Sequence, residues 1–307
     1  MASTLLQLVN RVQNELGLSA ATTIVGNSTQ EVVQLLGLTN AVGYELQQDG
    51  YQWQQIVKEY RTTTVFYTYT GTTTSGSTSI TGMSSIVGLD SKFMVTGTGI
   101  NQDTYVVTAV GSTVTISQAA ASTPTAPVTL TFSQTLYPMP SDFDRLVDNT
   151  QWDKTRHWVI IGPETGQQWQ WLKSGFISTG PRMRWRQLGG YFQIWPPLGV
   201  ADYIGFEYVS NQWVLSAAAQ VLGPTPDKSS FTVDTDVCIF NDTLMTLGIK
   251  SKYMQAKAWA DPYGTLFDQQ KSTAIASDAG SATLNMAPRM SDVLITQSNI
   301  PDSNFGT

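Results

Sequence analysis

A long stretch with almost no charge constrains the fold of this chain most strongly. Between residues 72 and 132 only Asp90, Lys92 and Asp103 are charged, and short runs rich in Val and Thr are separated by glycines. Such alternating runs are typical of half-buried strands, and the glycines mark turns between them. We therefore predict that residues 61–135 hold an inserted, small antiparallel β-sandwich-like domain, whose neutral surface suits contact with protein or sugar.

The residues before this insertion have the spacing of helices. Apolar side chains recur at helical intervals over residues 5–16, and a glycine closes that helix. A second helix is predicted from Ser28, because a glutamate three residues later gives the spacing of a capping box. The Asp-Gly pair at residues 49–50 ends it, and residues 53–60 continue with one apolar face. Residues 1–60 are thus expected to form the N-terminal helices of the core.

Helical spacing returns over residues 232–281, which we expect to form the C-terminal helices of the core. Pro262 separates two predicted helices. Asp234 and Asp236 precede them, where carboxylates are favourable partners of a helix N-terminus. The final residues, 282–307, are polar and have no helical period, so an extended C-terminal arm is expected.

The region between the insertion and the C-terminal helices is rich in tryptophan. Seven of the nine Trp residues fall within residues 136–231, in aromatic runs separated by Gly and Pro. This region is predicted to form an antiparallel sheet in which the runs GYFQIWP and DYIGFEYV are neighbours. Before it, Ser141 or Asp142 is expected to cap a helix. The run QQWQW at residues 167–171 is predicted to be a short helix or a loop.

Together these patterns predict an α+β fold. A helical bundle of the N- and C-terminal helices is expected to pack with an antiparallel Trp-rich β-sheet, and the small β-domain is inserted between them. The predicted boundaries follow the changes in pattern, and they are 1–60, 61–135, 136–231, 232–281 and 282–307.

Composition and charge exclude several classes of function. The chain has a single histidine, His157, and a single cysteine, Cys238, so neither a multi-histidine nor a Cys-rich metal site is possible. No nucleotide-binding motif is present, and we expect neither enzymatic activity nor a cofactor. The net charge of −6 disfavours nucleic-acid binding over the whole surface. No apolar run is long enough to span a bilayer, and the helical start is unlike a secretory signal peptide.

Three arginines alternate with apolar residues along PRMRWRQ at residues 181–187. In a strand the arginines would line one face, while Met183 and Trp185 point to the other. Three roles are open for that face: ion pairs with acids such as Glu207, a protein–protein contact, in which Trp and Arg are enriched, or contact with DNA. The candidate interface residues share this cationic and aromatic character, and they are Arg182, Arg184, Trp185, Arg186, Trp169 and Trp171.

The order of these parts resembles the head-to-tail adaptor (connector) proteins of short-tailed bacteriophages. The resemblance is carried by LYPMPSDFDRL at residues 136–146, by DYIGFEYVSNQWV at residues 202–214, and by the helical run at residues 242–270. The glycine-punctuated insertion is similar to β-modules spliced into phage tail and capsid subunits. Smaller adaptors lack so long a neutral insertion, so its role stays open.

This resemblance implies a structural virion protein at the head–tail junction, assembled in the host cytoplasm. Such adaptors form a dodecameric homo-oligomer ring below the portal protein, extend the DNA channel and give a downstream tail or nozzle protein its platform, with fibres as a further partner. DNA would pass without sequence-specific binding, and no membrane is involved. The arm would grip the portal, and its implied docking residues are Pro288, Arg289, Met290, Ile295, Ile300 and Phe305.

Two other functions remain open from the residues alone. Tryptophan-rich loops stack on sugar rings, which would suit a carbohydrate- or receptor-binding tail protein, although fibres of that kind usually contain little helix. A glycan-cleaving enzyme would need a pair of carboxylates. The candidate pairs are Asp142 with Asp144 and Glu164 with Glu207.

Overall fold

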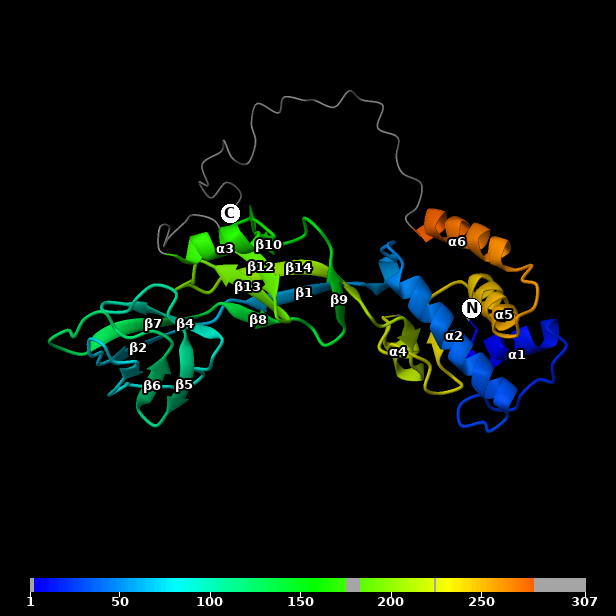
Figure 1. Ribbon diagram of the computed structural model, residues 1–307, viewed down its shortest axis with the longest axis horizontal. Coiled ribbons are helices and arrows are strands. Elements are labelled where there is room, and N and C mark those ends of the chain that lie inside the picture. The colour runs from blue at the N-terminus through cyan, green and yellow to red at the C-terminus, as the bar shows by residue number, and fades with distance from the viewer. Residues whose placement is uncertain (1–2, 175–182, 224, 279–307) are drawn as a thin grey trace, which may run out of the picture.

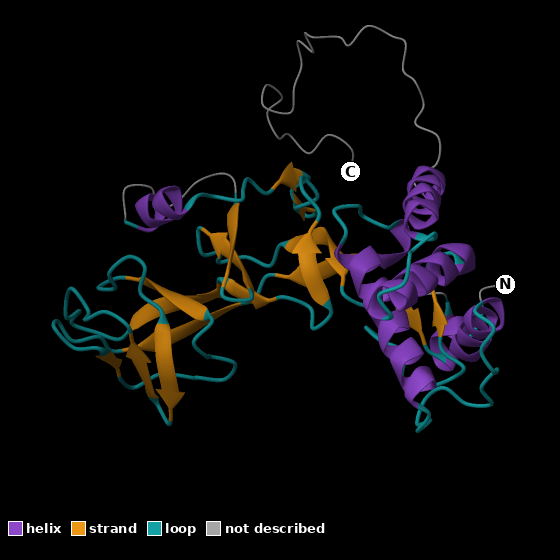
Figure 2. Ribbon diagram, turned by 45° about the vertical axis from the view of Figure 1, so that its right-hand side comes forward, coloured by secondary structure: helices purple, strands orange, loops and turns teal. Residues whose placement is uncertain are grey.

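The computed structural model describes residues 3–174, 183–223 and 225–278. They form an elongated molecule with most of the helices gathered at one end, a small all-β unit at the other, and two small sheets between them (Figure 1). Coloured by secondary structure, the molecule shows the same division (Figure 2). The prediction of mixed helix and antiparallel sheet is confirmed. The predicted arm and Arg182 lie outside the described residues.

The helical end, here called the helical body, is built from both ends of the chain. Its buried apolar side chains form one cluster that surrounds the fully buried Trp213. The first predicted helix is confirmed, and Thr4 caps it in a reciprocal capping box with Gln7. The elements of the helical body are α1 (Leu5–Glu15), α2 (Gln30–Gln48), β15 (Val214–Leu215), α4 (Ala217–Leu222), β16 (Val237–Cys238), α5 (Asp242–Ala256) and α6 (Gly264–Asp278).

Two predictions near α2 are wrong. Its N-cap is Thr29 rather than Ser28, and the Thr29 side chain makes no capping hydrogen bond. Residues 53–60 do not continue as a helix, because the short 3₁₀-helix Gln54–Ile56 leads directly into strand β1 (Val57–Thr63). Pairing with a distant strand along the whole of β1 outweighs the helical spacing of a few apolar residues.

The aspartates before α5 have roles other than the predicted one. Asn241 caps α5 by accepting hydrogen bonds from the backbone at Thr243 and Leu244. Asp234 instead accepts from the backbone N–H groups of residues 24 and 25 at 3.0 and 2.8 Å, which fastens the α1–α2 connection to the body. Asp236 forms an ion pair with Lys228 at 2.8 Å. These carboxylates bind the backbone and side chains of loops. The prediction that they interact with a helix N-terminus is therefore wrong.

Two antiparallel sheets, here called the central sheets, lie next to the helical body. In the first, β14 pairs with β1 and also with β9 and β10, and β11 follows β10. The second has the order β12-β13-β8. The strands besides β1 are β8 (Leu136–Pro138), β9 (Phe143–Leu146), β10 (Trp152–Asp153), β11 (Trp158–Val159), β12 (Arg184–Leu188), β13 (Tyr191–Trp195) and β14 (Tyr203–Ser210).

The predicted pairing of GYFQIWP with DYIGFEYV is wrong. These runs form β13 and β14, which belong to different central sheets. Phe192 of β13 stacks on Phe206 of β14 with ring centroids 4.8 Å apart. The two runs are therefore neighbours across a packed layer, because both carry large apolar side chains that are buried against each other.

The all-β end, here called the β-module, consists of two three-stranded sheets with the orders β2-β7-β4 and β3-β6-β5. Both sheets contribute side chains to one apolar core. Residues 62–70 alternate like a single strand but are divided between β1 and β2, because the chain passes there from the central sheets into the module. The strands are β2 (Phe66–Gly71), β3 (Ser79–Ile80), β4 (Phe93–Gly97), β5 (Val106–Val110), β6 (Thr113–Ile116) and β7 (Val128–Gln134).

Gly43 provides a test of the packing in the helical body. A Cβ atom added at Gly43 would lie 2.1 Å from the Trp213 indole, whereas at Gly37, on the same helix, it would meet no atom within 4 Å. We expect Gly43→Ala to lower the free energy of unfolding by roughly 1–3 kcal/mol through overpacking. Gly37→Ala should raise it by about 0.5–1 kcal/mol. Urea unfolding measures both changes, and equal midpoints for the two variants would contradict the packing described here.

Candidate interaction surfaces

The alternation predicted for the arginine-rich strand is present in the described residues. Met183 and Trp185 are buried, and Trp185 stacks on Phe192 with ring centroids 5.2 Å apart. Arg184 and Arg186 of β12 lie on the other face and are half-buried. The strand therefore contributes its apolar face to the core between the central sheets and leaves its cations near the surface.

Both arginines contact the segment that carries helix α3 (Gly166–Lys173). Arg184 forms an ion pair with Glu164, whose carboxylate is almost completely buried. The guanidinium of Arg186 lies against Gly166, where an added Cβ would be 3.4 Å from its nitrogens. The predicted acid, Glu207, is on β14, opposite Glu59 in the ladder. These cations thus fix α3 upon the second central sheet.

The predicted helix or loop at residues 167–171 belongs to α3, and its two tryptophans have different environments. Trp169 is buried with Leu172, Trp195 and Met94, the last from strand β4 of the β-module. Trp171 is 48% exposed. At the end of the helix, Lys173 forms an ion pair with Asp103 of the module at 2.9 Å. Helix α3 therefore connects the module to the central sheets.

These positions divide the candidate interface residues into two groups. Trp169 and Trp185 are buried within the chain, so a partner would reach them only through a rearrangement. Arg184, Arg186 and Trp171 retain surface that a partner can contact.

A partly buried polar network joins the central sheets to the helical body. The Lys58 ammonium group of β1 donates to Asp142 at 2.7 Å, to the Gln212 side chain at 2.8 Å and to the Pro226 carbonyl at 3.0 Å. Asp142 also accepts from Tyr208 and Ser210 at 3.0 and 2.8 Å. Burial by itself would raise the pKa of Asp142, but these hydrogen bonds outweigh it and hold the pKa below its ordinary value.

This network replaces the helix cap predicted at residues 141–142. Strand β9, and not a helix, follows Asp142. The predicted cap is therefore wrong, because an ion pair with a residue more than eighty positions earlier determines where this carboxylate lies. No local pattern contains that partner.

Three of the four candidate catalytic carboxylates form ion pairs. Asp142 pairs with Lys58, Asp144 with Arg145, and Glu164 with Arg184. Within the described residues, His, Cys, Asp and Glu side chains nowhere gather in threes that could hold a metal ion. Burial raises the pKa of the Cys238 thiol to about 12, so it stays protonated as a small core side chain.

Among the described residues, every helix is too short or too polar to cross a membrane.

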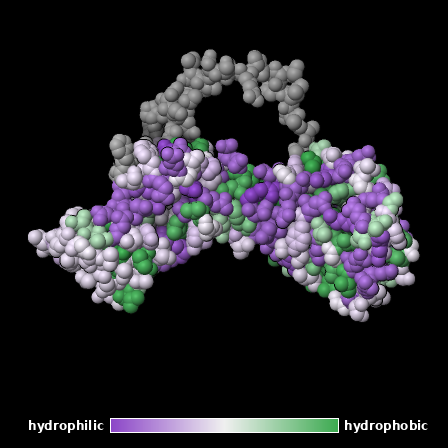
Figure 3. All heavy atoms as spheres, viewed as in Figure 1, coloured by the Kyte–Doolittle hydropathy of each residue, from purple (hydrophilic) through white to green (hydrophobic). Residues whose placement is uncertain are grey.

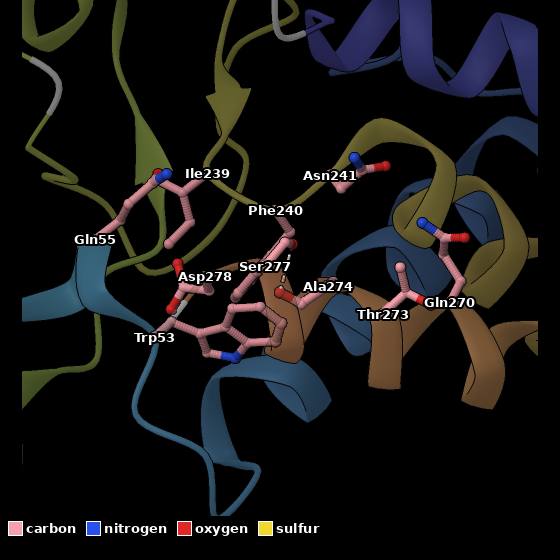
Figure 4. A pocket seen from close by; sticks show the side chains of 10 residues that line it. All are labelled: Trp53, Gln55, Ile239, Phe240, Asn241, Gln270, Thr273, Ala274, Ser277 and Asp278. Carbon is pink, nitrogen blue, oxygen red and sulfur yellow. Dashed lines mark hydrogen bonds between the residues drawn. The ribbon is translucent and has the colours of Figure 1, made fainter. Parts of the chain in front are cut away.

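A cavity of about 530 Å³ lies beside α6 (Figure 4). Trp53 and Phe240 of the apolar core line one side of it, and polar side chains of α6 line the other. Asp278, in the last turn of α6, accepts hydrogen bonds from the Tyr51 hydroxyl at 3.1 Å and from the Gln54 backbone at 2.9 Å. Burial and this carboxylate raise the pKa of Tyr51. No sequence pattern pointed to this cavity, because its walls come from distant segments.

Exposed apolar side chains mark two further surfaces. The β-module is mostly neutral in hydropathy, with apolar side chains gathered at the end formed by β5 and β6 (Figure 3). Val107 and Val110 of β5 contribute to this exposure. In the helical body, α4 buries none of its residues, and Val221 and Leu222 are 86% and 88% exposed. The sequence shows two apolar residues at the end of α4, but no sequence pattern indicates that they are exposed.

Comparison with known protein families identifies one match. The model of the SU10 adaptor protein family matches residues 100–291, well over half of the chain. The match begins inside the β-module, between β4 and β5, and continues through the central sheets to α5 and α6. The chain has no match among curated proteins.

The Lys58–Asp142 network predicts a pH-dependent stability. The Lys58 and Asp142 side chains are 19% and 12% exposed, so removing one leaves the other only partly compensated, and Lys58→Met should cost about 1–3 kcal/mol. The pKa of Asp142 is lowered in the folded chain, so its contribution is complete above about pH 4 and is lost as the pH falls through the folded-state value. In Lys58→Met that pKa rises towards or above its ordinary value, so the variant should lose less stability than the wild-type chain as the pH falls from about 5 to about 3.

Urea midpoints measured from about pH 3 to pH 7 test this prediction. Lys252→Met is the control, because its ion pair with Glu45 is more exposed and should contribute less than about 1 kcal/mol. Indistinguishable pH profiles for the two variants would contradict the role given to the network.

Proposed function

The chain belongs to the SU10 adaptor protein family and is a phage head-to-tail adaptor, and we propose that it serves a short-tailed bacteriophage as the ring below the portal. The family is structural and not typically enzymatic, and it implies association with portal and tail proteins at the head–tail junction of the virion. The match over residues 100–291 carries this proposal. The alternative of a sugar-binding tail protein has no comparable support.

In the proposed assembly, copies of the chain form a dodecameric ring whose channel passes DNA without reading its sequence. A closed ring needs two different faces on each subunit, because each copy contacts its neighbours through unlike surfaces. The helical body offers two such faces. Val221 and Leu222 are exposed on α4, and Trp259 and Leu266 are exposed around the α5–α6 turn. In Figure 1, α4 and this turn lie on opposite sides of α2.

The arm at residues 282–307 is proposed to grip the portal, through the docking residues that the family resemblance implies. It continues from α6, the helix at the edge of the helical body (Figure 1). Arg184, Arg186 and Trp171 would face the downstream tail or nozzle protein. The β-module would stand outside the ring or support fibres, and its neutral surface is compatible with either position.

Deleting residues 282–307 tests the arm. The truncated chain keeps every described residue, so we expect it to stay folded, with an unchanged circular dichroism spectrum. Binding to rings of the portal protein encoded by the same phage should be lost, as measured by co-sedimentation and electron microscopy. Undiminished portal binding by the folded, truncated chain would refute the proposed grip.

Replacing Val221 and Leu222 together with serine tests the ring face. Because both side chains are almost fully exposed, the free chain should keep its stability within about 0.5 kcal/mol. Ring formation on portal rings should weaken at least about tenfold, since the apolar area for the contact is removed. Val87→Ser is the control, because Val87 is exposed in the β-module. Equal ring formation by both variants would exclude α4 from the subunit contact.

A further inference from the structure

The cavity beside α6 is a recess large enough to hold several side chains. Its volume of about 530 Å³ lies within the range of about 300–1,000 Å³ that is usual for binding pockets. Trp53 and Phe240 are 6% and 4% exposed, so this wall is part of the core of the helical body. The opposite wall belongs to α6, in which only Phe267 is buried.

The electrostatics of the recess favour a cation. Asp278 is the one charged residue among the described residues that line it. The two groups that donate to its carboxylate, the Tyr51 hydroxyl and the Gln54 N–H, are neutral. The nearest basic side chain on α6, Lys271, pairs with Asp49. A carboxylate beside an indole ring suits a guanidinium, which can form a charge-assisted hydrogen bond with one and stack on the other.

The chain itself carries a segment with the matching chemistry. Asp278 is on the rim of the recess and is followed directly by residues 279–307. Arg289 is the one basic residue in that stretch, and Met286, Pro288 and Met290 flank it with apolar surface. At about 3.3–3.6 Å per residue, the intervening chain is long enough to double back over a single helix.

We propose that residues 286–290 of the same chain occupy the recess beside α6, with Arg289 bound to Asp278 and its methionine neighbours packed on Trp53 and Phe240. Charge complementarity and the short connection select this occupant over a second copy. The segment also contains residues proposed to dock on the portal. Portal binding would therefore have to compete with binding in the recess, and the free subunit would keep its arm covered. This consequence rests on the proposed function, whereas the binding of residues 286–290 in the recess does not.

Limited trypsin digestion of the full-length chain tests directly whether residues 286–290 occupy the recess. Trypsin cuts after Lys and Arg, and Arg289 is its one target in residues 279–307. A guanidinium bound to Asp278 is protected from the protease. We expect Asp278→Asn to speed cleavage at Arg289 about tenfold, because it removes the charge from the ion pair. Asp268→Asn is the matched control, since it makes the same change at an exposed position of the same helix and should leave the rate unchanged.

Two further measurements separate release of the segment from damage to α6. Cleavage at Lys271 should stay constant in Asp278→Asn, because Lys271 reports on the helix itself. Thr273→Trp fills the recess from an exposed position without changing Asp278, and it should also speed cleavage at Arg289.

The outcomes are distinct. Equal cleavage at Arg289 in the wild-type chain, Asp278→Asn and Thr273→Trp would overturn the proposal, whether that cleavage is fast or slow. Protection that grows with protein concentration would also overturn it, by assigning the occupant to a second copy. These experiments contain no portal protein, so failure of the wild-type chain to bind portal rings would count against the proposed function alone.

Discussion

The contacts of Lys58 hold together parts of the chain that are far apart in sequence. Its ammonium group reaches a carboxylate before β9, an amide after β14 and a carbonyl of the loop that follows α4. Because β1 also leads the chain into the β-module, the position of this one strand affects all three parts of the molecule. A partly buried charge is costly when a partner is missing, so this network favours the one arrangement in which every partner is present.

The β-module is attached by different means. The chain enters it at β2 and leaves it at β7, and these two strands pair with each other along β2. A second attachment comes from α3, where Trp169 packs on Met94 and Lys173 pairs with Asp103. The few charged residues of the insertion form ion pairs within the chain. Asp90 pairs with Lys92, and Asp103 pairs with Lys173 of α3. The module's outer surface is left to hydroxyl, backbone and small apolar groups.

Features with local causes could be predicted from the sequence. The apolar spacing of α1 and the alternation along β12 both follow from the geometry of one element, and both are present in the structure. The partner of Asp142, the buried carboxylate that binds Arg184 and the layered packing of β13 on β14 depend on residues distant in sequence. The helical spacing of residues 53–60 misled for the same reason, since β14 supplies a pairing that no local pattern contains.

The parts of the molecule differ in the kind of contact they can make. The helical body exposes apolar side chains on α4 and at the α5–α6 turn. The central sheets expose cations, α3 exposes Trp171, and the β-module is nearly uncharged. Apolar contacts between copies would be insensitive to salt, whereas contacts through half-buried arginines would weaken with ionic strength. An adaptor whose subunits join through the helical body and bind a tail protein through the central sheets would therefore keep its ring under conditions that release its partner.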